Sequence, residues 1–285
     1  MRNPFSRILT LAICLLPFIL PAQSMVVSEG LSIRSDYGYE LIGRLRDRIL
    51  LFRDKFDEFE VQAFDNQMRL SWSRELDDLE KRGVQILSVV GSKNDFSVVH
   101  KVRRRSHAVL RIHKYDPGAN LIDSMLVKDY GERVFSPPVL DIVRSDDRNC
   151  FVVFNSSERD KLEITCFRLD KMQVLWDKTI AVDNDFSDLN IQAMALSNAG
   201  DFFFITEKNN RRNKIEEHEC RILRVNATSE TLTRVPMSEF LTNDMQFVYD
   251  NQNQRLTGAG LYADKNRDRA NGYFFLSVTP GETSQ

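Results

Sequence analysis

Short apolar segments alternate with polar turns along most of the chain, and few segments repeat their apolar residues at helical spacing. The pattern is clearest in residues 190–235, where apolar segments occupy 191–196, 201–206, 220–225 and 231–235. Short apolar runs bounded by turn residues are typical of β-strands. The sequence therefore predicts four strands here, joined as an antiparallel unit without a long helix.

The same unit recurs along the chain at a nearly constant spacing. A polar turn leads into an apolar strand at Phe96, Cys150, Phe202 and Leu256, and these positions are 54, 52 and 54 residues apart. A looser copy leads into Ile49. Periods of this length indicate a repeat fold. The predicted units comprise residues 37–74, 84–127, 139–179, 190–235 and 245–278.

The second strands of two units are apolar without interruption, at 151–154 and 202–205. Such strands are covered on both faces, as happens when sheets are arranged radially in a β-propeller. The sequence therefore predicts an all-β, five-bladed β-propeller of four-stranded antiparallel blades. The fifth unit lacks a segment for its last strand, and residues 25–33 are predicted to close the ring by supplying it. The alternatives are an incomplete ring and a chain that is part of a longer propeller.

Two segments combine an Asp turn with a strand that carries Trp: Asp65 precedes Trp72, and Asp170 precedes Trp176. They resemble the blade signature of quinoprotein-like and WD40-like propellers, and residues 37–278 resemble an exported bacterial propeller of this kind. The resemblance implies the fold. The turn glycine of quinoproteins and the Trp-Asp ending of WD40 blades are absent, so no quinone and no other cofactor is implied.

The first 24 residues have the features of a secretory signal peptide. Two arginines precede the apolar run 8–20, and Ala22 and Ser24 are the small residues that a cleavage site requires. The run is too short to span a bilayer as a helix. The sequence predicts cleavage after Ser24, a propeller domain over residues 25–285 without a transmembrane segment, and a periplasmic or secreted location.

Cleavage also changes the charge of the chain. The full sequence has 39 basic and 41 acidic side chains, and the loss of two arginines leaves 37 basic ones, a net charge of −4. A protein of this charge is not a general binder of nucleic acid. No nucleic-acid partner is therefore predicted.

Three cysteines remain after cleavage: Cys150, Cys166 and Cys220. In a hairpin centred on Glu158, Cys150 and Cys166 would lie directly opposite each other, close enough for a disulfide. An exported domain permits such a bond. Two buried free thiols are the alternative, and Cys220 is expected to be unpaired in the core.

Three of the predicted loops between second and third strands are basic. In a propeller these loops share one face with the links between blades, and arginine binds carboxylates and phosphates well. This face is therefore a candidate site for a protein or an anionic glycan. The candidate binding residues are Arg103, Arg104, Arg105, Arg211, Arg212, Lys214, Lys265, Arg267 and Arg269. The links are acidic, however, and mutual neutralisation of these charges is the alternative.

No other group of residues indicates a particular chemistry. The loop 183–188 offers oxygen ligands but lacks the glycine and the closing glutamate of a calcium loop, so no metal is predicted. His100 and His107 are expected to face each other across a hairpin centred between Arg103 and Arg104, as a cross-strand pair and not as metal ligands. The sequence contains no Gly-rich phosphate loop and no nucleophile elbow.

The predicted function is therefore non-catalytic: an exported propeller that binds a protein or glycan partner with its loops. This step rests on analogy with other propellers. The alternative is a glycan-processing enzyme of the five-bladed glycoside hydrolase type, which needs carboxylates on its innermost strands. Asp141 lies on a predicted first strand, Glu40 is the second candidate, and no third one stands out.

Overall fold

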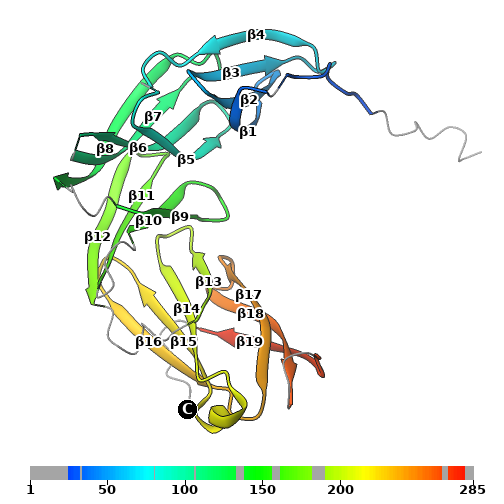
Figure 1. Ribbon diagram of the computed structural model, residues 1–285, viewed down its shortest axis with the longest axis vertical. Coiled ribbons are helices and arrows are strands. Elements are labelled where there is room, and N and C mark those ends of the chain that lie inside the picture. The colour runs from blue at the N-terminus through cyan, green and yellow to red at the C-terminus, as the bar shows by residue number, and fades with distance from the viewer. Residues whose placement is uncertain are drawn as a thin grey trace, which may run out of the picture. The chain divides into compact units, whose positions relative to one another are not determined.

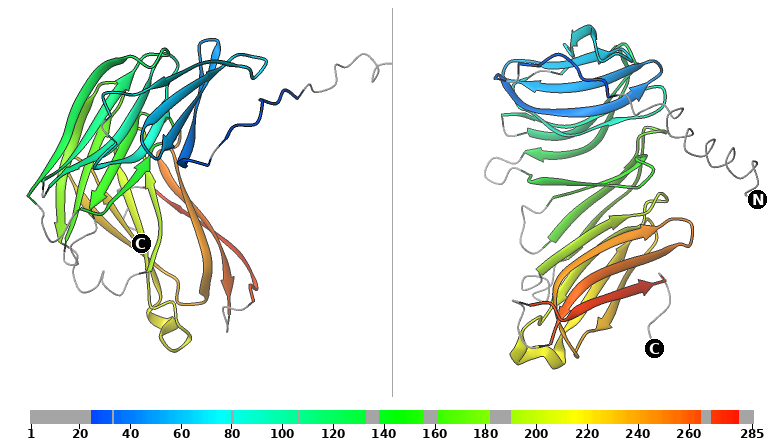
Figure 2. Two further views of the ribbon diagram at one scale, coloured as in Figure 1. Left: turned by 45° about the horizontal axis from the view of Figure 1, so that its top comes forward. Right: turned by 90° about the vertical axis from the view of Figure 1, so that its right-hand side faces the viewer.

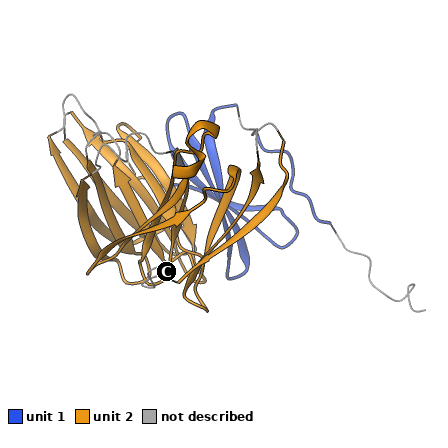
Figure 3. Cartoon of the chain, turned by 90° about the horizontal axis from the view of Figure 1, so that it is seen from below, with its two compact units in different colours: residues 1–75 blue, residues 76–285 orange. Residues whose placement is uncertain are grey.

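The computed structural model describes residues 25–285 except 33, 80, 106, 133–137, 156–160, 182–189, 265–268 and 280–285. The chain divides into two compact units, unit 1 (Met1–Glu75) and unit 2 (Leu76–Gln285), each of which is described by itself (Figure 3). No helix within the described ranges is long and apolar enough to cross a membrane. The predicted signal peptide, residues 1–24, lies outside these ranges, and a single domain over 25–285 stays a prediction.

Unit 1 contains one antiparallel sheet whose strands are paired in chain order. The strands are β1 (Asp36–Leu45), β2 (Arg48–Lys55), β3 (Phe59–Phe64) and β4 (Leu70–Glu75). The third strand is buried along its whole length, because it lies between β2 and β4 in the sheet.

Unit 2 contains four antiparallel sheets that follow one another along the chain, each with its strands in sequential order (Figure 1). The first sheet comprises β5 (Val84–Gly91), β6 (Phe96–Arg104), β7 (His107–Tyr115) and β8 (Leu121–Glu132). The second comprises β9 (Leu140–Arg144), β10 (Cys150–Asn155), β11 (Lys161–Arg168) and β12 (Gln173–Ala181). The third comprises β13 (Asn190–Leu196), β14 (Phe202–Lys208), β15 (Glu219–Val225) and β16 (Glu230–Pro236). The fourth comprises β17 (Leu241–Asp250), β18 (Arg255–Ala263) and β19 (Gly272–Val278).

The repeat predicted from the sequence matches these sheets. Phe96, Cys150 and Phe202 are the first residues of β6, β10 and β14, and Leu256 and Ile49 are the second residues of β18 and β2. The polar turn residues are not part of the strand ladder, so each second strand begins at or just before the apolar residue that follows the turn. The spacing of about one sheet per repeat is therefore confirmed.

Serine and aspartate side chains hold the turns before the second strands in unit 2. The hydroxyl of Ser145 donates to Asp147 Oδ1 at 2.6 Å and accepts the Cys150 N–H at 3.0 Å. Neighbouring turns are also connected, since the Asn198 amide oxygen accepts the Asp147 N–H at 3.2 Å and the Asn251 amide oxygen accepts the Asn198 N–H at 2.8 Å. The turns of the second, third and fourth sheets therefore lie side by side at one end of unit 2.

The core of unit 2 lies between successive sheets, which pack face to face (Figure 2). Phe151 of β10 faces the first sheet, whereas Val152 on the same strand faces the third. Phe202 and Phe203 of β14 divide in the same way between the second and fourth sheets. The uninterrupted apolar strands are thus covered on both faces, as predicted.

First strands lie beside first strands throughout unit 2: β5 beside β9, β9 beside β13, and β13 beside β17. The predicted all-β fold of antiparallel sheets is confirmed, and this strand arrangement is that of a β-propeller. One element of the prediction is wrong. Residues 25–32 form no strand, and the last sheet has three strands among the described residues, because this segment makes no ladder of backbone hydrogen bonds.

Candidate functional site

In unit 2, the loops between second and third strands lie at the same end of the sheets as the links between sheets. Lys101, near the end of β6, donates from Nζ to the backbone oxygen of Pro138 in the next link at 3.0 Å. Asn210, in the loop after β14, donates from Nδ2 to the backbone oxygen of Thr242 at the start of β17, at 2.8 Å. Side chains of these loops and links therefore share one surface.

The candidate basic residues that the structure describes are all exposed on this surface. Arg103 and Arg104 end β6, Arg105 forms the turn, and the loop after β14 contains the short 3₁₀ helix η2 (Arg212–Glu217). No ion pair is formed within the described ranges by Arg103, Arg105, Arg211, Arg212, Lys214 or Arg269. Lys265 and Arg267 lie outside those ranges. Neutralisation of this surface by the acidic links stays an open alternative, because the acidic link 183–188 lies outside those ranges as well.

A buried network fixes the loop that carries Arg211, Arg212 and Lys214. Glu207, at the end of β14, accepts a hydrogen bond from His218 Nε2 at 2.8 Å, and both side chains are fully buried. Its other oxygen accepts from Asn210 Nδ2 at 2.8 Å, and Thr242 donates its hydroxyl to the first oxygen. His218 Nδ1 donates to the Phe240 carbonyl at 2.8 Å. The loop is thus attached at both ends to the link that leads into β17.

The charge on His218 makes this network sensitive to pH. Burial alone would lower the pKa of His218, but the hydrogen bonds to Glu207 and to the backbone carbonyls outweigh it and raise the pKa. A raised folded-state pKa gives stability that is fully present below the unfolded value of about 6.5 and is lost as pH rises through the folded value. We expect His218→Gln to remove this part of the pH dependence. Urea unfolding of both proteins across this range would measure it, and parallel stability curves would contradict the assignment.

A cavity of about 500 Å³ opens beside the β6–β7 hairpin at the same end of unit 2. We call it the histidine-lined cavity. Its apolar walls are Leu79, Val84, Val102, Val109 and Leu126, and its polar lining is Asp78, His100, Arg104, His107, Arg111, His113 and Asp129. The polar residues of β6 and β7 share a face because paired residues of an antiparallel ladder point to the same side. The register pairs His100 with Arg111 and Arg104 with His107.

Both carboxylates of the histidine-lined cavity have partners within the fold. Asp78 accepts hydrogen bonds from the Tyr115 hydroxyl and from His113 Nδ1, the latter at 2.9 Å. Asp129 contacts His107 Nε2 at 3.1 Å. Burial, together with Asp78, raises the pKa of Tyr115, so its hydroxyl remains a donor. In the described part of the chain neither carboxylate is paired with Arg111.

The two buried histidines of the cavity are neutral at pH 7. Burial lowers the pKa of His100 to about 4, with a contribution from His113, and burial also lowers the pKa of His113 although Asp78 opposes this effect. His100 Nδ1 donates to the Val98 carbonyl at 3.3 Å, as His113 Nδ1 does to Asp78. The Nε2 atom of each neutral ring is therefore left as a hydrogen-bond acceptor. Arg111, whose charge also acts on both rings, has no carboxylate partner in the described part of the chain.

Sequence reasoning missed this cavity and misplaced its histidines. The predicted pairing of His100 with His107 is wrong, because the hairpin turns at Arg105, whose φ is +57°, two residues beyond the assumed centre. His100 instead contacts His113 edge to face, with ring centroids 4.6 Å apart. Asp78 lies in the segment that links β4 to β5, far in the sequence from the β6–β7 hairpin, so its place at the cavity is seen only in the structure.

The two cysteines of the disulfide candidate do not lie directly opposite each other. The register pairs Cys150 with Arg168 and Cys166 with Val152, because the hairpin is centred one residue later than expected. All three described cysteines are free thiols. Cys220 is buried and unpaired, and burial raises its pKa to about 12.

The remaining predicted positions are the possible calcium loop and the carboxylates of the glycoside hydrolase alternative. Within the described ranges no group of three or more His, Cys, Asp or Glu side chains could hold a metal ion, and the loop 183–188 lies outside them. Asp141 is exposed on β9 and Glu40 is half-buried on β1. Unit 2 has two further carboxylates on first strands, Asp244 and Asp250, and Asp250 accepts hydrogen bonds from the turn residue Asn253.

The comparisons with known proteins found distant structural neighbours and no sequence relative. The sequence matches no known protein family, and no curated protein is similar to it. Solved structures with a similar fold include an uncharacterised protein from Listeria monocytogenes EGD-e, with 11% identity, coverage of 90% of this chain and 70% of that one, and a TM-score of 0.42. The β-propeller domain of Vanderwaltozyma polyspora Nup133 has 10% identity, coverage of 61% and 54%, and a TM-score of 0.32. A GH43 β-1,3-galactosidase has 9% identity, coverage of 82% and 88%, and a TM-score of 0.32. Similarity this low does not bear on function.

Proposed function

We propose that the chain is an exported, non-catalytic binding module, and that unit 2 binds an anionic glycan in the histidine-lined cavity. Arg111 carries the proposal. Its guanidinium lines the cavity without a carboxylate partner in the described part of the chain, and guanidinium groups bind carboxylates with paired hydrogen bonds. A carboxylate of the ligand would supply the missing partner.

The neutral imidazoles favour a sugar as the bearer of that carboxylate. His100 and His113 each offer an Nε2 acceptor because their Nδ1 protons are used within the fold. Hydroxyl groups are donors that suit such acceptors. The cavity of about 500 Å³ is within the ordinary range for a ligand pocket, and its valine and leucine walls suit the apolar face of a sugar ring. An acidic sugar combines all three requirements.

The basic hairpin extends the site beyond the cavity. Arg103 and Arg105 are exposed beside Arg104, which lines the cavity. A glycan with regularly spaced carboxylates would contact these side chains once one sugar occupies the cavity. The basic loops alone would serve an acidic protein surface instead, and that partner would not need the cavity. The glycoside hydrolase alternative rests on Asp141 and Glu40 and gains no support from the cavity.

We expect a uronic-acid disaccharide, digalacturonate, to bind the chain from residue 25 onward, and Arg111→Gln to weaken binding about 10- to 100-fold, because one charge-assisted contact contributes roughly 1.5–3 kcal/mol. Isothermal titration calorimetry would give the dissociation constants. The dimethyl ester of the same disaccharide, which has the ring but no charge, is expected not to bind.

Arg255→Gln is the matched control, because Arg255 is exposed at the opposite end of its sheet and is paired with Asp250. It is expected to leave binding unchanged. A glycan array with uronic, sulfated and phosphorylated members would extend the test. Equal binding of acid and ester, or an Arg111→Gln protein that is folded and binds as tightly as the original, would contradict the proposal.

A further inference from the structure

Two thiols of the second sheet in unit 2 are in contact. Cys150 begins β10 and Cys166 lies near the end of β11, and their side chains are on the same face of the sheet, diagonal to each other. Their Sγ atoms are 3.5 Å apart, and both residues are fully buried. Adjacent strands of a sheet are twisted relative to one another, and here the twist brings the side chains of Cys150 and Cys166 together.

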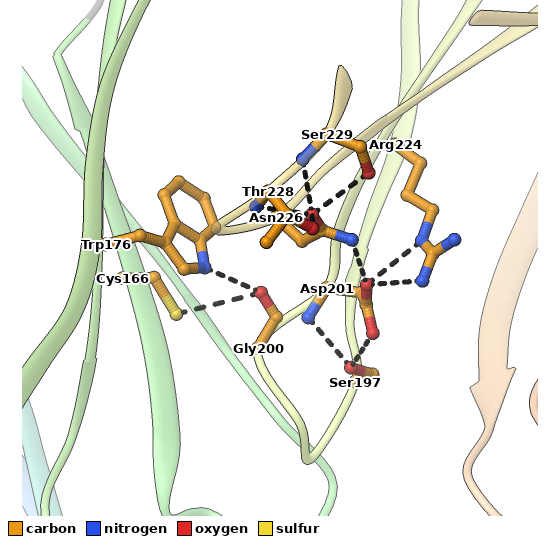
Figure 4. Close-up of polar contacts among 9 residues, drawn as sticks. All are labelled: Cys166, Trp176, Ser197, Gly200, Asp201, Arg224, Asn226, Thr228 and Ser229. Carbon is orange, nitrogen blue, oxygen red and sulfur yellow. Dashed lines mark hydrogen bonds and ion pairs between the residues drawn. The ribbon is translucent and has the colours of Figure 1, made fainter. Parts of the chain in front are cut away.

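The third sheet covers the pair with a residue that has no side chain. A Cβ at Gly200 would lie 3.3 Å from Cys166 Sγ and 3.6 Å from Cys150 Sγ. The carbonyl oxygen of Gly200 is 4.0 Å from Cys166 Sγ and accepts the Trp176 Nε1–H at 2.9 Å (Figure 4). Trp176 is also paired with Cys166 in the ladder of β11 and β12. The indole therefore lies next to the thiol pair.

We infer that Cys150 and Cys166 are a disulfide site, which closes without any change of strand pairing. A disulfide bond is about 2.0 Å long, so the sulfur atoms need to approach by about 1.5 Å, a distance that rotation of two side chains can supply. The bond would join β10 to β11 within the core between the second and third sheets.

The chemistry is an exchange with a disulfide of low molecular weight. The Cys150 thiolate attacks one sulfur of oxidised glutathione and releases glutathione thiolate. The Cys166 thiol then loses its proton and attacks Cys150 Sγ in the mixed disulfide, which releases the second glutathione. The two cysteines lose two electrons and two protons, and both are transferred to the glutathione pair.

Cys150 is the better first nucleophile. The hydrogen bond from the Cys166 thiol lowers the pKa of Cys150 more than burial raises it, and Arg168 adds to the lowering. Thiolates, not thiols, are the reacting species. Because both sulfur atoms are buried, the first step takes place during folding or a local opening of the hairpin.

The test compares the chain incubated during refolding with oxidised glutathione and with a reductant. We expect peptide mapping by mass spectrometry to find Cys150 joined to Cys166 in the oxidised sample and Cys220 as a free thiol. The oxidised form is expected to unfold at a temperature about 5–10 °C higher, because a disulfide that closes a short loop lowers the conformational entropy of the unfolded chain. In a Trp72→Phe background, Trp176 fluorescence is expected to be quenched by the adjacent disulfide.

Cys220→Ser is the matched control, because it removes a buried thiol that has no thiol neighbour, and it should leave all three readouts unchanged. Cys150→Ala should abolish the link, the quenching and the difference in unfolding temperature together. Recovery of both Cys150 and Cys166 as free thiols from folded protein, after refolding with oxidised glutathione, would overturn the inference. A link from either residue to Cys220 would overturn it equally.

Discussion

Replacing Glu207 with alanine is expected to lower the free energy of unfolding of unit 2 by about 3–5 kcal/mol, the usual cost of removing one partner from a buried ion pair. His218 Nε2 would lose its acceptor, and Asn210 Nδ2 would lose one as well. His218 cannot reach water in the folded state without a rearrangement, since it is fully buried, whereas Asn210 Nδ2 keeps the Thr242 carbonyl as an acceptor. Urea unfolding at pH 6, followed by circular dichroism, would measure the change.

Glu207→Gln separates charge from shape in the same network. Its amide oxygen still accepts from His218 Nε2, but its NH₂ group faces the donor Asn210 Nδ2, so we expect an intermediate loss of about 1–3 kcal/mol. The variant should also lose the pH dependence attributed to His218. If alanine at position 207 destabilised unit 2 no more than glutamine does, the buried ion pair would not be the source of the stability.

The positions of strands could be predicted from the sequence because turns have a local signature. A serine or aspartate that bonds to backbone groups two or more residues on ends one strand and starts the next. Ser145 and Asp147 do so before β10, and the short apolar run that follows is typical of a buried strand. The end of one strand and the start of the next thus depend on a few neighbouring residues, which is why strand positions can be predicted from the sequence.

Pairing across a hairpin could not be predicted to the residue. The Arg105 turn adopts a positive φ, which arginine adopts only rarely, and nothing in the sequence marks this residue as the turning point. A shift of the centre by one residue moves each partner by two. A shift of two residues pairs His100 with Arg111 and not with His107, and a shift of one places Cys150 diagonal to Cys166 where direct opposition was expected.

The candidate site depends on contacts that are distant in the sequence. Asp78 belongs to a link and meets His113 and Tyr115 thirty-five and thirty-seven positions later. The spacing of these residues in the sequence does not predict their contact, because a linking segment is not paired with the strands in a fixed register. The basic hairpin could be identified from its composition, whereas the neutral histidines beside Arg111 could not, since their protonation depends on burial.

Replacing Gly200 with alanine is expected to destabilise unit 2 by about 2–4 kcal/mol, because backbone strain and crowding add together. Gly200 has φ of +96°, a conformation that residues with a Cβ rarely adopt, and the added Cβ would lie 3.0 Å from Leu175 Cδ1 and 3.3 Å from Cys166 Sγ. The turn cannot move away easily. The next residue, Asp201, is held by Arg224 Nη2 at 2.7 Å and by Asn226 Nδ2 at 2.9 Å (Figure 4).

Gly131→Ala distinguishes strain from crowding, because Gly131 also has a positive φ, +68°, but an added Cβ would have no atom within 4 Å. It is expected to cost about 1–2 kcal/mol, the strain alone. Leu175→Ala combined with Gly200→Ala should recover part of the crowding energy in a double-mutant cycle. If Gly200→Ala cost no more than Gly131→Ala, the second and third sheets would not pack as closely over the thiol pair as this structure requires, and the inference about Cys150 and Cys166 would lose its geometric basis.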